Sequence, residues 1–355
     1  MGMLIEGRWT NETPDTSGGR FVRPESSFRA HVSADGASGF KAEAGRYHLY
    51  VSYGCPWAHR AIIFRALKGL QNMVSMSIAL PDDRCYGWRY GAAFPGATAD
   101  EVNGFTWLHQ AYSAADPAYS GKVTVPTLWD KHTRSIVNNE SSEIIRMFNS
   151  AFEALGATPG DYYPARLAAE IDRINEVVYT GLNNGVYRCG FAASQAAYDD
   201  AVGRVFACLD FLEQRLGAQR YLAGDAITEA DWRLFVTLVR FDAVYHHAFK
   251  CMLRPLSSYH HLGNYLRELY QVPGVADTVR LDHIVTSYYS SERVNPNGIV
   301  PVVPALDFSL PHDRADLKES MAIARDLRLR ARDCRQTLCH ALRPSERPLQ
   351  RHDRR

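Results

Sequence analysis

A single cysteine, Cys55, stands between an apolar run and a helix-like segment in residues 50–70, YVSYGCPWAHRAIIFRALKGL. Pro56 suits the first position of a helix, because the N–H group that proline lacks would have no partner there. Cys55 would then lie in the field of the free N–H groups of the first helical turn, which stabilises a thiolate. These residue types favour a nucleophilic thiol over a buried packing cysteine or a metal ligand.

The other cysteines offer no obvious chemistry. The chain has seven, at positions 55, 85, 189, 208, 251, 334 and 339. None forms a CxxC pair and none has a nearby histidine at zinc-site spacing, so we expect no metal site.

A proline marks a second segment that could bind a ligand. Pro126 interrupts the strand-like run at 122–130, KVTVPTLWD, although proline is out of place in a central strand. A cis Val125-Pro126 bond would present the N–H and C=O groups of Val125 to an extended peptide. We therefore expect a peptide-binding edge at this point.

A third segment combines a carboxylate with a hydroxyl group. Glu140 and Ser141 occur in NNESSEI, at the start of an expected helix. The free N–H groups of such a helix suit a carboxylate, and Glu140 could bind an ammonium group. Ordinary helix capping explains the same two residues, so both interpretations stay open.

The surrounding pattern indicates two kinds of structure. The first half predicts a strand, a helix and a parallel strand, followed by a long insert, two strands and a helix. These elements fall at residues 47–53, from 56, 73–80, 81–121, 122–130, 134–139 and from 140. The second half has helical periodicity at residues 165–187, 197–217, 227–245 and 256–275, with a capping-box pattern at Thr228 and Asp231.

Composition excludes several classes of protein. The 355 residues are 46% hydrophobic and 11% aromatic, which is typical of a packed globular protein. The net charge is +1, but the Arg-rich stretch 316–355 carries a surplus of positive charge, so the rest is slightly acidic and does not suggest nucleic-acid binding. No apolar run approaches the ~18 residues of a membrane-spanning helix. The first residues also lack a signal-peptide pattern, and we expect a cytoplasmic protein with reduced cysteines and no membrane partner.

Six blocks, taken in order, resemble one known family. They read GCPWAHR, GWRYGAAFPGAT, SGKVTVPTLWDK, NNESSEIIRMFN, NNGVYRCGF and TEADWRLFVTLVRFDAVY. Together they resemble the glutathionyl-hydroquinone reductases, the Xi class of glutathione transferases, over residues 40–313. The resemblance implies an α/β plus all-α fold, with a thioredoxin-like N-terminal domain followed by an all-helical C-terminal domain.

The resemblance implies a reaction and a set of catalytic residues. The Cys55 thiolate would attack the sulfur of a glutathionyl-hydroquinone, releasing hydroquinone and leaving a mixed disulfide that a second glutathione resolves to GSSG. Because Ala58 stands where a CxxC partner would, the resolving thiol must come from outside. Tyr187 matches the family's proposed acid/base tyrosine, and Tyr245 and Tyr288 match tyrosines that would stabilise the thiolate.

The resemblance also implies a glutathione site and a dimer. The site would comprise Trp88, Lys122, Val123, Thr124, Val125, Pro126, Glu140 and Ser141. Lys122 stands where many relatives have arginine, so a bidentate contact with a glutathione carboxylate is lost. Glutathione would be the co-substrate, with no metal, and the protein a homodimer. An aromatic glutathione conjugate would be the substrate in quinone metabolism.

Two alternatives remain open from the sequence. One is another cysteine-type glutathione-dependent enzyme, either a dehydroascorbate reductase or a reductive dehalogenase. The other is a non-catalytic binding module of glutathione transferase shape. For the chain as a whole we expect an extended arm at 1–45, the thioredoxin-like domain at 46–155 with its insert at 81–121, and the helical domain at 160–293. We expect a C-terminal extension at 294–315 and a disordered tail at 316–355.

Overall fold

The N-terminal half is built on a four-stranded sheet. The structure, a computed structural model, describes residues 2–11, 20–82 and 86–317. The sheet has the order β6-β5-β7-β8, in which β5 and β6 are parallel while β7 is antiparallel to β5 and β8 to β7. These strands span Tyr47–Val51 (β5), Val74–Ile78 (β6), Thr127–Asp130 (β7) and Ser135–Asn138 (β8). This arrangement is the thioredoxin-like fold that the resemblance implied.

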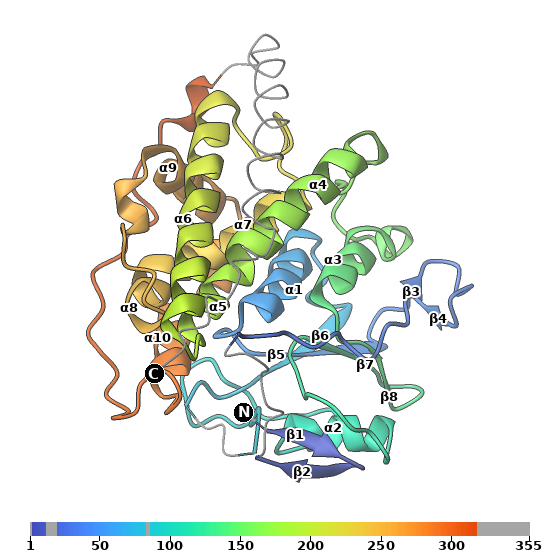
Figure 1. Ribbon diagram of the computed structural model, residues 1–355. Helices are drawn as coiled ribbons and strands as arrows, with labels where there is room; N and C mark the ends of the chain where they lie inside the picture. The colour runs from blue at the N-terminus through green and yellow to red at the C-terminus, as the bar shows by residue number, and fades with distance from the viewer. Residues whose placement is uncertain (1, 12–19, 83–85, 318–355) are drawn as a thin grey trace, which may run out of the picture.

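Helices cover both faces of the sheet. In Figure 1, α1 (Pro56–Leu67) and α3 (Ser141–Ser150) lie above the sheet, and α2 (Leu108–Ala115) lies below it. All residues of β5 are buried as a result, which explains why its sequence is mostly apolar and aromatic rather than alternating, with His48 as the exception. The helix α1 ends before Gly69, whose φ of +65° suits glycine at a helix terminus.

The long insert is more ordered than its composition indicates. We expected a loop-like segment at 81–121, but it contains α2, with Gln110 bonded back to the N-cap residue Trp107. The Asp100 carboxylate accepts hydrogen bonds from three backbone N–H groups, those of Val102, Asn103 and Phe105, and so organises the turn before α2. Helix α2 has only two turns, which is too short for its periodicity to stand out in the sequence.

One expected strand is shorter than predicted. The segment 122–130 was expected to be a strand interrupted by Pro126, and β7 begins only at Thr127, directly after a cis Val125-Pro126 bond. The cis bond itself is confirmed. Residues 122–125 form a loop, because proline cannot donate to the ladder and the chain turns at this position.

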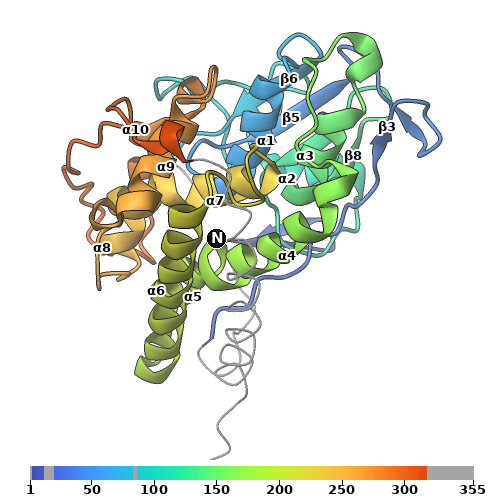
Figure 2. The ribbon, with the colours of Figure 1, turned by 90° about the horizontal axis from the view of Figure 1, so that it is seen from above.

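The C-terminal half is helical, and it lies beside the sheet domain in both ribbon views (Figures 1 and 2). Its elements are α4 (Ala168–Val178), α5 (Gly185–Gly190), α6 (Gln195–Ala218), α7 (Glu229–Arg240), α8 (His246–Ala248), α9 (His260–Tyr270) and α10 (Leu281–Tyr289). π-Helical turns at Tyr179–Asn183 and Phe241–Tyr245 join α4 to α5 and α7 to α8. The capping box of Thr228 and Asp231 at the start of α7 is confirmed.

Short elements complete the chain. Two-residue and three-residue strands in the N-terminal arm are β1 (Met3–Ile5), β2 (Arg8–Thr10), β3 (Val32–Ser33) and β4 (Phe40–Lys41). Short 3-10 helices occur at Glu153–Leu155, Ala165–Leu167, Leu256–Ser258, Ala276–Thr278 and Arg314–Asp316. The expected tail, apart from its first two residues, lies outside the described residues. Among the helices that the structure describes, none is long and apolar enough to cross a bilayer.

Candidate active site

Cys55 lies at the N-terminus of α1, as the sequence predicts. It is the N-cap residue, with Pro56 at the first helical position, and its carbonyl accepts the first helical hydrogen bond from the N–H of His59 at 3.0 Å. Its side chain is 9% exposed, and the thiol donates to the carbonyl oxygen of Val125 across a Sγ–O distance of 3.5 Å. The nucleophile candidate and the peptide-binding candidate therefore lie next to each other.

Helix α2 and the turn after it hold the loop that precedes Pro126. The Tyr112 hydroxyl donates to the carbonyl of Thr124 at 3.0 Å and accepts from the Thr124 N–H at 3.3 Å. The Tyr119 hydroxyl donates to the carbonyl of Lys122 at 3.0 Å. The backbone beside Cys55 is thus fixed by tyrosines from the insert, which explains why an enzyme would keep so long a segment there.

Glu140 and Ser141 lie at the start of α3, where Glu140 is the N-cap. One Glu140 oxygen accepts from the N–H of Ser142 at 3.0 Å, and the other accepts from the Ser26 hydroxyl at 2.9 Å. Burial opposes ionisation of Glu140, but these hydrogen bonds outweigh it and hold the carboxyl pKa below its usual value. Ser141 accepts from the Arg60 guanidinium at 3.3 Å. The capping interpretation is therefore confirmed, and ligand binding by the same residues stays a prediction.

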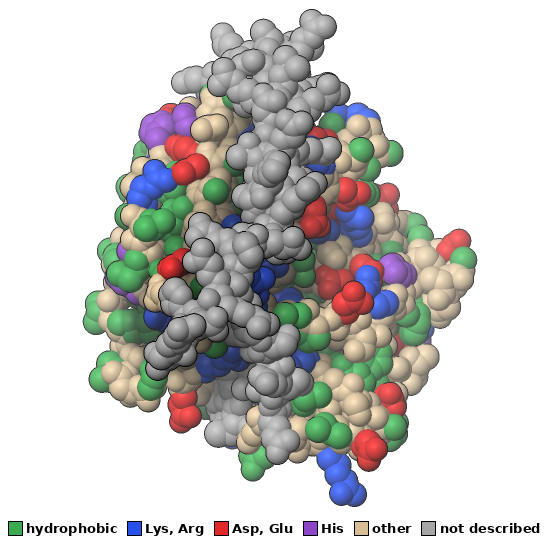
Figure 3. Space-filling view, viewed as in Figure 1, with side chains coloured by type: hydrophobic (Ala, Val, Ile, Leu, Met, Phe, Trp, Pro, Cys, Tyr) green, Lys and Arg blue, Asp and Glu red, His purple; other side chains and the backbone are tan. Residues whose placement is uncertain are grey.

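Trp88 comes from the insert, and Lys122 directly follows it. Trp88 is buried, and its carbonyl accepts from the N–H of Leu108, so the residue pins the insert to the core. Lys122 is partly buried, and burial together with the charge of Arg293 lowers the pKa of its ammonium group. Lysine and arginine side chains gather in the middle of the face that Figure 3 shows, near the border between the two domains. Such a face suits an anionic ligand.

The three candidate tyrosines form one chain of hydroxyl groups. The hydroxyl oxygens of Tyr187 and Tyr288 are 2.6 Å apart, and those of Tyr245 and Tyr288 are 3.0 Å apart. Burial raises the pKa of each phenol well above its usual value, and the nearby Cys55 adds to the effect at Tyr187. All three are therefore neutral hydroxyls that can donate or accept a proton in a hydrogen bond.

The structure thus brings Tyr187 close to Cys55. The hydrogen bond observed for the Cys55 thiol goes to Val125, while the tyrosine hydroxyls bond to one another. Stabilisation of the thiolate by Tyr245 and Tyr288 stays a prediction.

The N-terminal arm contributes residues that the sequence analysis missed. The ring of Phe21 stacks on that of Tyr187, with centroids 6.1 Å apart. The Arg23 guanidinium lies over the rings of Tyr187 and Trp57 and donates to the amide oxygen of Asn184 at 2.9 Å. The contacts with Tyr187 and Asn184 join residues more than 100 positions apart, and the arm has no periodicity that would have indicated them.

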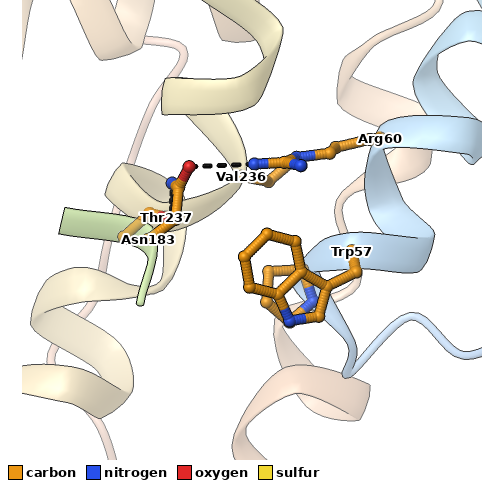
Figure 4. A pocket seen from close by; sticks show the side chains of 6 residues that line it. Trp57, Arg60, Asn183, Val236 and Thr237 are labelled. Carbon is orange, nitrogen blue, oxygen red and sulfur yellow. Dashed lines mark hydrogen bonds between the residues drawn. The ribbon is translucent and has the colours of Figure 1, made fainter. Parts of the chain in front are cut away.

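A second arginine, Arg60, also packs on the ring of this tryptophan (Figure 4). Arg60 lies over the ring of Trp57 at 4.5 Å and donates to the Asn183 side chain at 2.8 Å. Burial lowers the pKa of Arg60 to about 9. The hollow that these side chains line with Val236 and Thr237 has no room for a water molecule. It is therefore a packed contact between the two domains, not a ligand pocket.

Metal chemistry finds no support in the described part of the chain. No group of three or more histidine, cysteine, aspartate or glutamate side chains there could hold a metal ion. The four cysteines that the structure describes, Cys55, Cys189, Cys208 and Cys251, are all free thiols.

Comparison with known families places both halves of the chain. Residues 54–151 match the model of the glutathione S-transferase N-terminal domain, and residues 195–268 match that of the C-terminal domain. The chain is 52% identical over 323 residues to glutathionyl-hydroquinone reductase YqjG of Escherichia coli, covering 88% of this chain and 98% of the relative. It is 53% identical over 310 residues to glutathionyl-hydroquinone reductase PcpF of Sphingobium chlorophenolicum, covering 86% and 97%.

Solved structures agree with these relatives. The glutathione-bound structure of Escherichia coli YqjG superposes with a TM-score of 0.83 at 50% identity, covering 89% of this chain and 99% of that one. A Xi-class glutathione transferase from Natrialba magadii superposes with a TM-score of 0.85 at 43% identity, covering 89% and 98%.

Proposed function

The chain belongs to the glutathionyl-hydroquinone reductases of the glutathione S-transferase family, and we propose how its own residues carry out the reaction. It is a glutathione-dependent oxidoreductase that reduces glutathionyl-hydroquinones to hydroquinones and releases GSSG. One observation carries the mechanism. Cys55 stands at the N-terminus of α1, with its thiol on the carbonyl of Val125.

In the first step the Cys55 thiolate attacks the sulfur of the substrate. A Cys–S–S–glutathione bond forms, the carbon–sulfur bond breaks, and its electron pair stays on the ring carbon. Tyr187 delivers the proton to that carbon, and hydroquinone leaves. The first-turn N–H groups of α1 favour the thiolate that starts the step.

In the second step another glutathione resolves the mixed disulfide. Its thiol returns a proton to the Tyr187 phenolate, and the resulting thiolate attacks the sulfur of the bound glutathione. The bond to Cys55 breaks, and GSSG leaves with the Cys55 thiolate restored. An external thiol is required because Ala58 occupies the position of a resolving cysteine. The two steps together convert one conjugate and one glutathione into hydroquinone and GSSG.

The glutathione part of the substrate would lie along the loop before the cis-proline. Val125 would pair with its backbone, and Val123 and Thr124 would lie alongside. Glu140 and Ser141 would hold its ammonium and carboxylate groups at the start of α3. Lys122 would hold a second carboxylate, and Trp88 would close the site. The low pKa of the Glu140 carboxyl supports this assignment, because a charged carboxylate binds an ammonium group more strongly than a neutral acid does.

A direct experiment tests the proposal. Purified protein is mixed with glutathionyl-menadiol in the absence of free glutathione and analysed by mass spectrometry. We expect one equivalent of menadiol and one glutathione adduct, located on Cys55. Addition of glutathione should then release GSSG. An adduct on Cys189 or Cys251 instead would overturn the assignment.

Another glutathione-dependent activity is suggested by one relative. The chain is 42% identical to a protein named glutathione S-transferase omega-like 2 of Schizosaccharomyces pombe. Dehydroascorbate, the substrate of one alternative that the sequence leaves open, should therefore be assayed beside the conjugate. A higher kcat/KM for dehydroascorbate would make reductive thiol transfer to that substrate the main activity.

We also propose the setting in which the enzyme works. Its four described cysteines are free thiols, which suits a cytoplasmic location where glutathione is reduced. A homodimer is expected from the resemblance and is checked by mass photometry. The domain limits 46–155 and 160–293 are likewise our proposal, supported by family matches that fall within them.

A further inference from the structure

An arginine that forms no ion pair with any residue the structure describes is buried directly behind the reactive cysteine. Arg240, the last residue of α7, is fully buried. Its guanidinium donates to the carbonyl of Tyr53 at 2.7 Å, that of Gly54 at 3.3 Å and that of Val236 at 2.7 Å. The fourth hydrogen bond observed goes to Nδ1 of His59 at 3.0 Å. All four acceptors are neutral groups.

The hydrogen-bond network shows that His59 is a neutral hydrogen-bond acceptor for Arg240 and leaves the positive charge of the guanidinium in place. The hydroxyl of Thr278 donates to the carbonyl of Val275 at 2.6 Å, so it accepts from Nε2 of His59 at 2.9 Å. The proton of His59 is therefore on Nε2, and Nδ1 accepts from Arg240. Burial and the charge of Arg240 lower the pKa of His59 well below its usual value, so the imidazole is neutral.

Two helices of the C-terminal domain, α7 and α10, contact the backbone directly before Cys55. Arg240 bonds to the carbonyl groups of the two residues before Cys55. In addition, a Cβ atom added to Gly54 would lie 2.2 Å from Oγ of Ser287 in α10, so only glycine fits there. Two helices of the C-terminal domain therefore position the reactive loop of the N-terminal domain.

A buried charge without a counter-ion is costly unless the function supplies one. The Cys55 thiolate is the anion that the catalytic cycle forms and reforms, and Cys55 directly follows the two residues whose carbonyl groups this guanidinium binds. We propose that Arg240 is a positioning residue for Cys55: it fixes the loop through Tyr53 and Gly54, and its charge stabilises the thiolate. The proposal rests on the proposed function, because only that function requires a thiolate at Cys55.

Other groups also lie near Cys55, and their effects on its thiol have to be distinguished from the effect of Arg240. Tyr187 lies near the sulfur, and its hydroxyl bonds to that of Tyr288, which bonds in turn to Tyr245. Burial raises the pKa of Tyr245 and Tyr288, and the charge of Arg240 partly offsets it. Arg23 faces Tyr187 from the arm, and α1 contributes its N-terminal N–H groups. Arg240 differs from all of these in being a fully buried permanent charge.

The test follows the pH dependence of Cys55 alkylation by iodoacetamide, measured on the Cys55 peptide by mass spectrometry. Arg240→Met should raise the midpoint pH of alkylation by about one unit or more, since it removes a buried charge near the thiolate. Arg240→Lys keeps the charge and should stay near the wild-type midpoint, while its kcat falls because one ammonium cannot hold both carbonyl groups. His59→Gln is the matched control. It disturbs the same network without changing its charge and should leave the midpoint in place.

Two results would overturn the proposal. One is a folded Arg240→Met protein with the wild-type midpoint, and the other is a His59→Gln midpoint shifted as far as that of Arg240→Met. If Arg240→Met does not fold, Arg240→Gln takes its place. An alkylation midpoint of Arg240→Gln equal to that of Arg240→Lys would then count against a role for the charge. Alkylation needs no hydroquinone substrate, so absence of reductase turnover would count against the proposed function and not against this role of Arg240.

Discussion

The hydroxyl oxygens of Tyr187 and Tyr288 lie 2.6 Å apart. This distance couples two roles that the family resemblance kept separate, proton donation to the substrate by Tyr187 and stabilisation of the Cys55 thiolate by Tyr288. Each hydroxyl has one proton to donate. If Tyr187 donates to the substrate carbon, it must accept from Tyr288, and Tyr288 must then accept from Tyr245. If Tyr288 donates to the Cys55 sulfur instead, it cannot support Tyr187 at the same moment. Tyr288 is therefore the member of the chain on which both steps depend.

Substitution of the three tyrosines by phenylalanine should separate these roles. Loss of a hydrogen bond to a charged acceptor costs about 1.5–3 kcal/mol, which corresponds to roughly one to two pH units in the alkylation midpoint of Cys55. We expect Tyr288→Phe and Tyr245→Phe to raise the midpoint, and Tyr288→Phe also to slow hydroquinone release. Tyr187→Phe should slow release alone. A Tyr187→Phe midpoint displaced as far as that of Tyr288→Phe would contradict this division.

Cys55→Ser should abolish turnover and leave glutathione binding in place, because serine retains the geometry but is a far weaker nucleophile. Turnover is followed by GSSG formation and binding by calorimetry. Cys208→Ala is the control. Burial raises the pKa of the Cys208 thiol to about 12, so this sulfur is inert, and its removal should cost stability but not activity. Residual GSSG formation by Cys55→Ser would mean that another thiol carries the reaction.

Arg23→Met should weaken the aromatic side of the site. It removes a guanidinium that lies over Trp57 and Tyr187 and bonds to Asn184, interactions worth about 1–2 kcal/mol together. We expect KM for glutathionyl-menadiol to rise several-fold in steady-state assays. Arg29→Met, on the same arm, removes an exposed ion pair with Glu143 and should change KM little. Equal effects of the two substitutions would show that the arm acts only through its general stability.

His48 should make the protein less stable in mild acid. It is buried between the hydroxyls of Ser75 and Ser77, and burial lowers its pKa to about 4. Between pH 6.5 and 4 the unfolded chain takes up a proton that the folded chain does not, so the free energy of unfolding falls as pH falls, by on the order of 3 kcal/mol over the window. Urea unfolding at pH 7.5 and pH 5 measures the effect.

His48→Gln is the control for this prediction, because glutamine can reach both hydroxyls but does not titrate. Its unfolding free energy should vary less between the two pH values than that of the wild type. An identical pH dependence would assign the effect to other groups, of which the fully buried His59 is the first to examine.

Local patterns in the sequence predicted the parts of the site that are local in the structure. Cys55 with Pro56 at a helix start and Val125 with its cis-proline each depend on residues that are neighbours in the chain. The contact of Cys55 with Val125 followed from the family resemblance, since 70 positions separate the two. Short elements such as α2 and α10 escaped the analysis because two helical turns give too few periodic positions.

Residues that act through backbone carbonyls could not be predicted. Arg240 binds Tyr53 and Gly54, 187 and 186 positions away, through groups that every residue has. The apolar residues around it in its own segment indicate that it is buried, but they do not indicate which groups it binds. Arg23 is similar, because its aromatic partners come from both domains and its own segment shows no periodicity.

The arm at residues 20–31 adds a further tie between the two domains, besides the covalent link and the packed interface between them. Arg23 bonds to Asn184 in the helical domain, while Ser26 bonds to Glu140 and the Phe28 N–H to Asn139 in the other. Domains joined only by a linker and a modest interface can open independently. Here, separating one domain from the other breaks contacts of both. The molecule should therefore melt in a single cooperative transition, and proteolytic removal of the arm should resolve that transition into two.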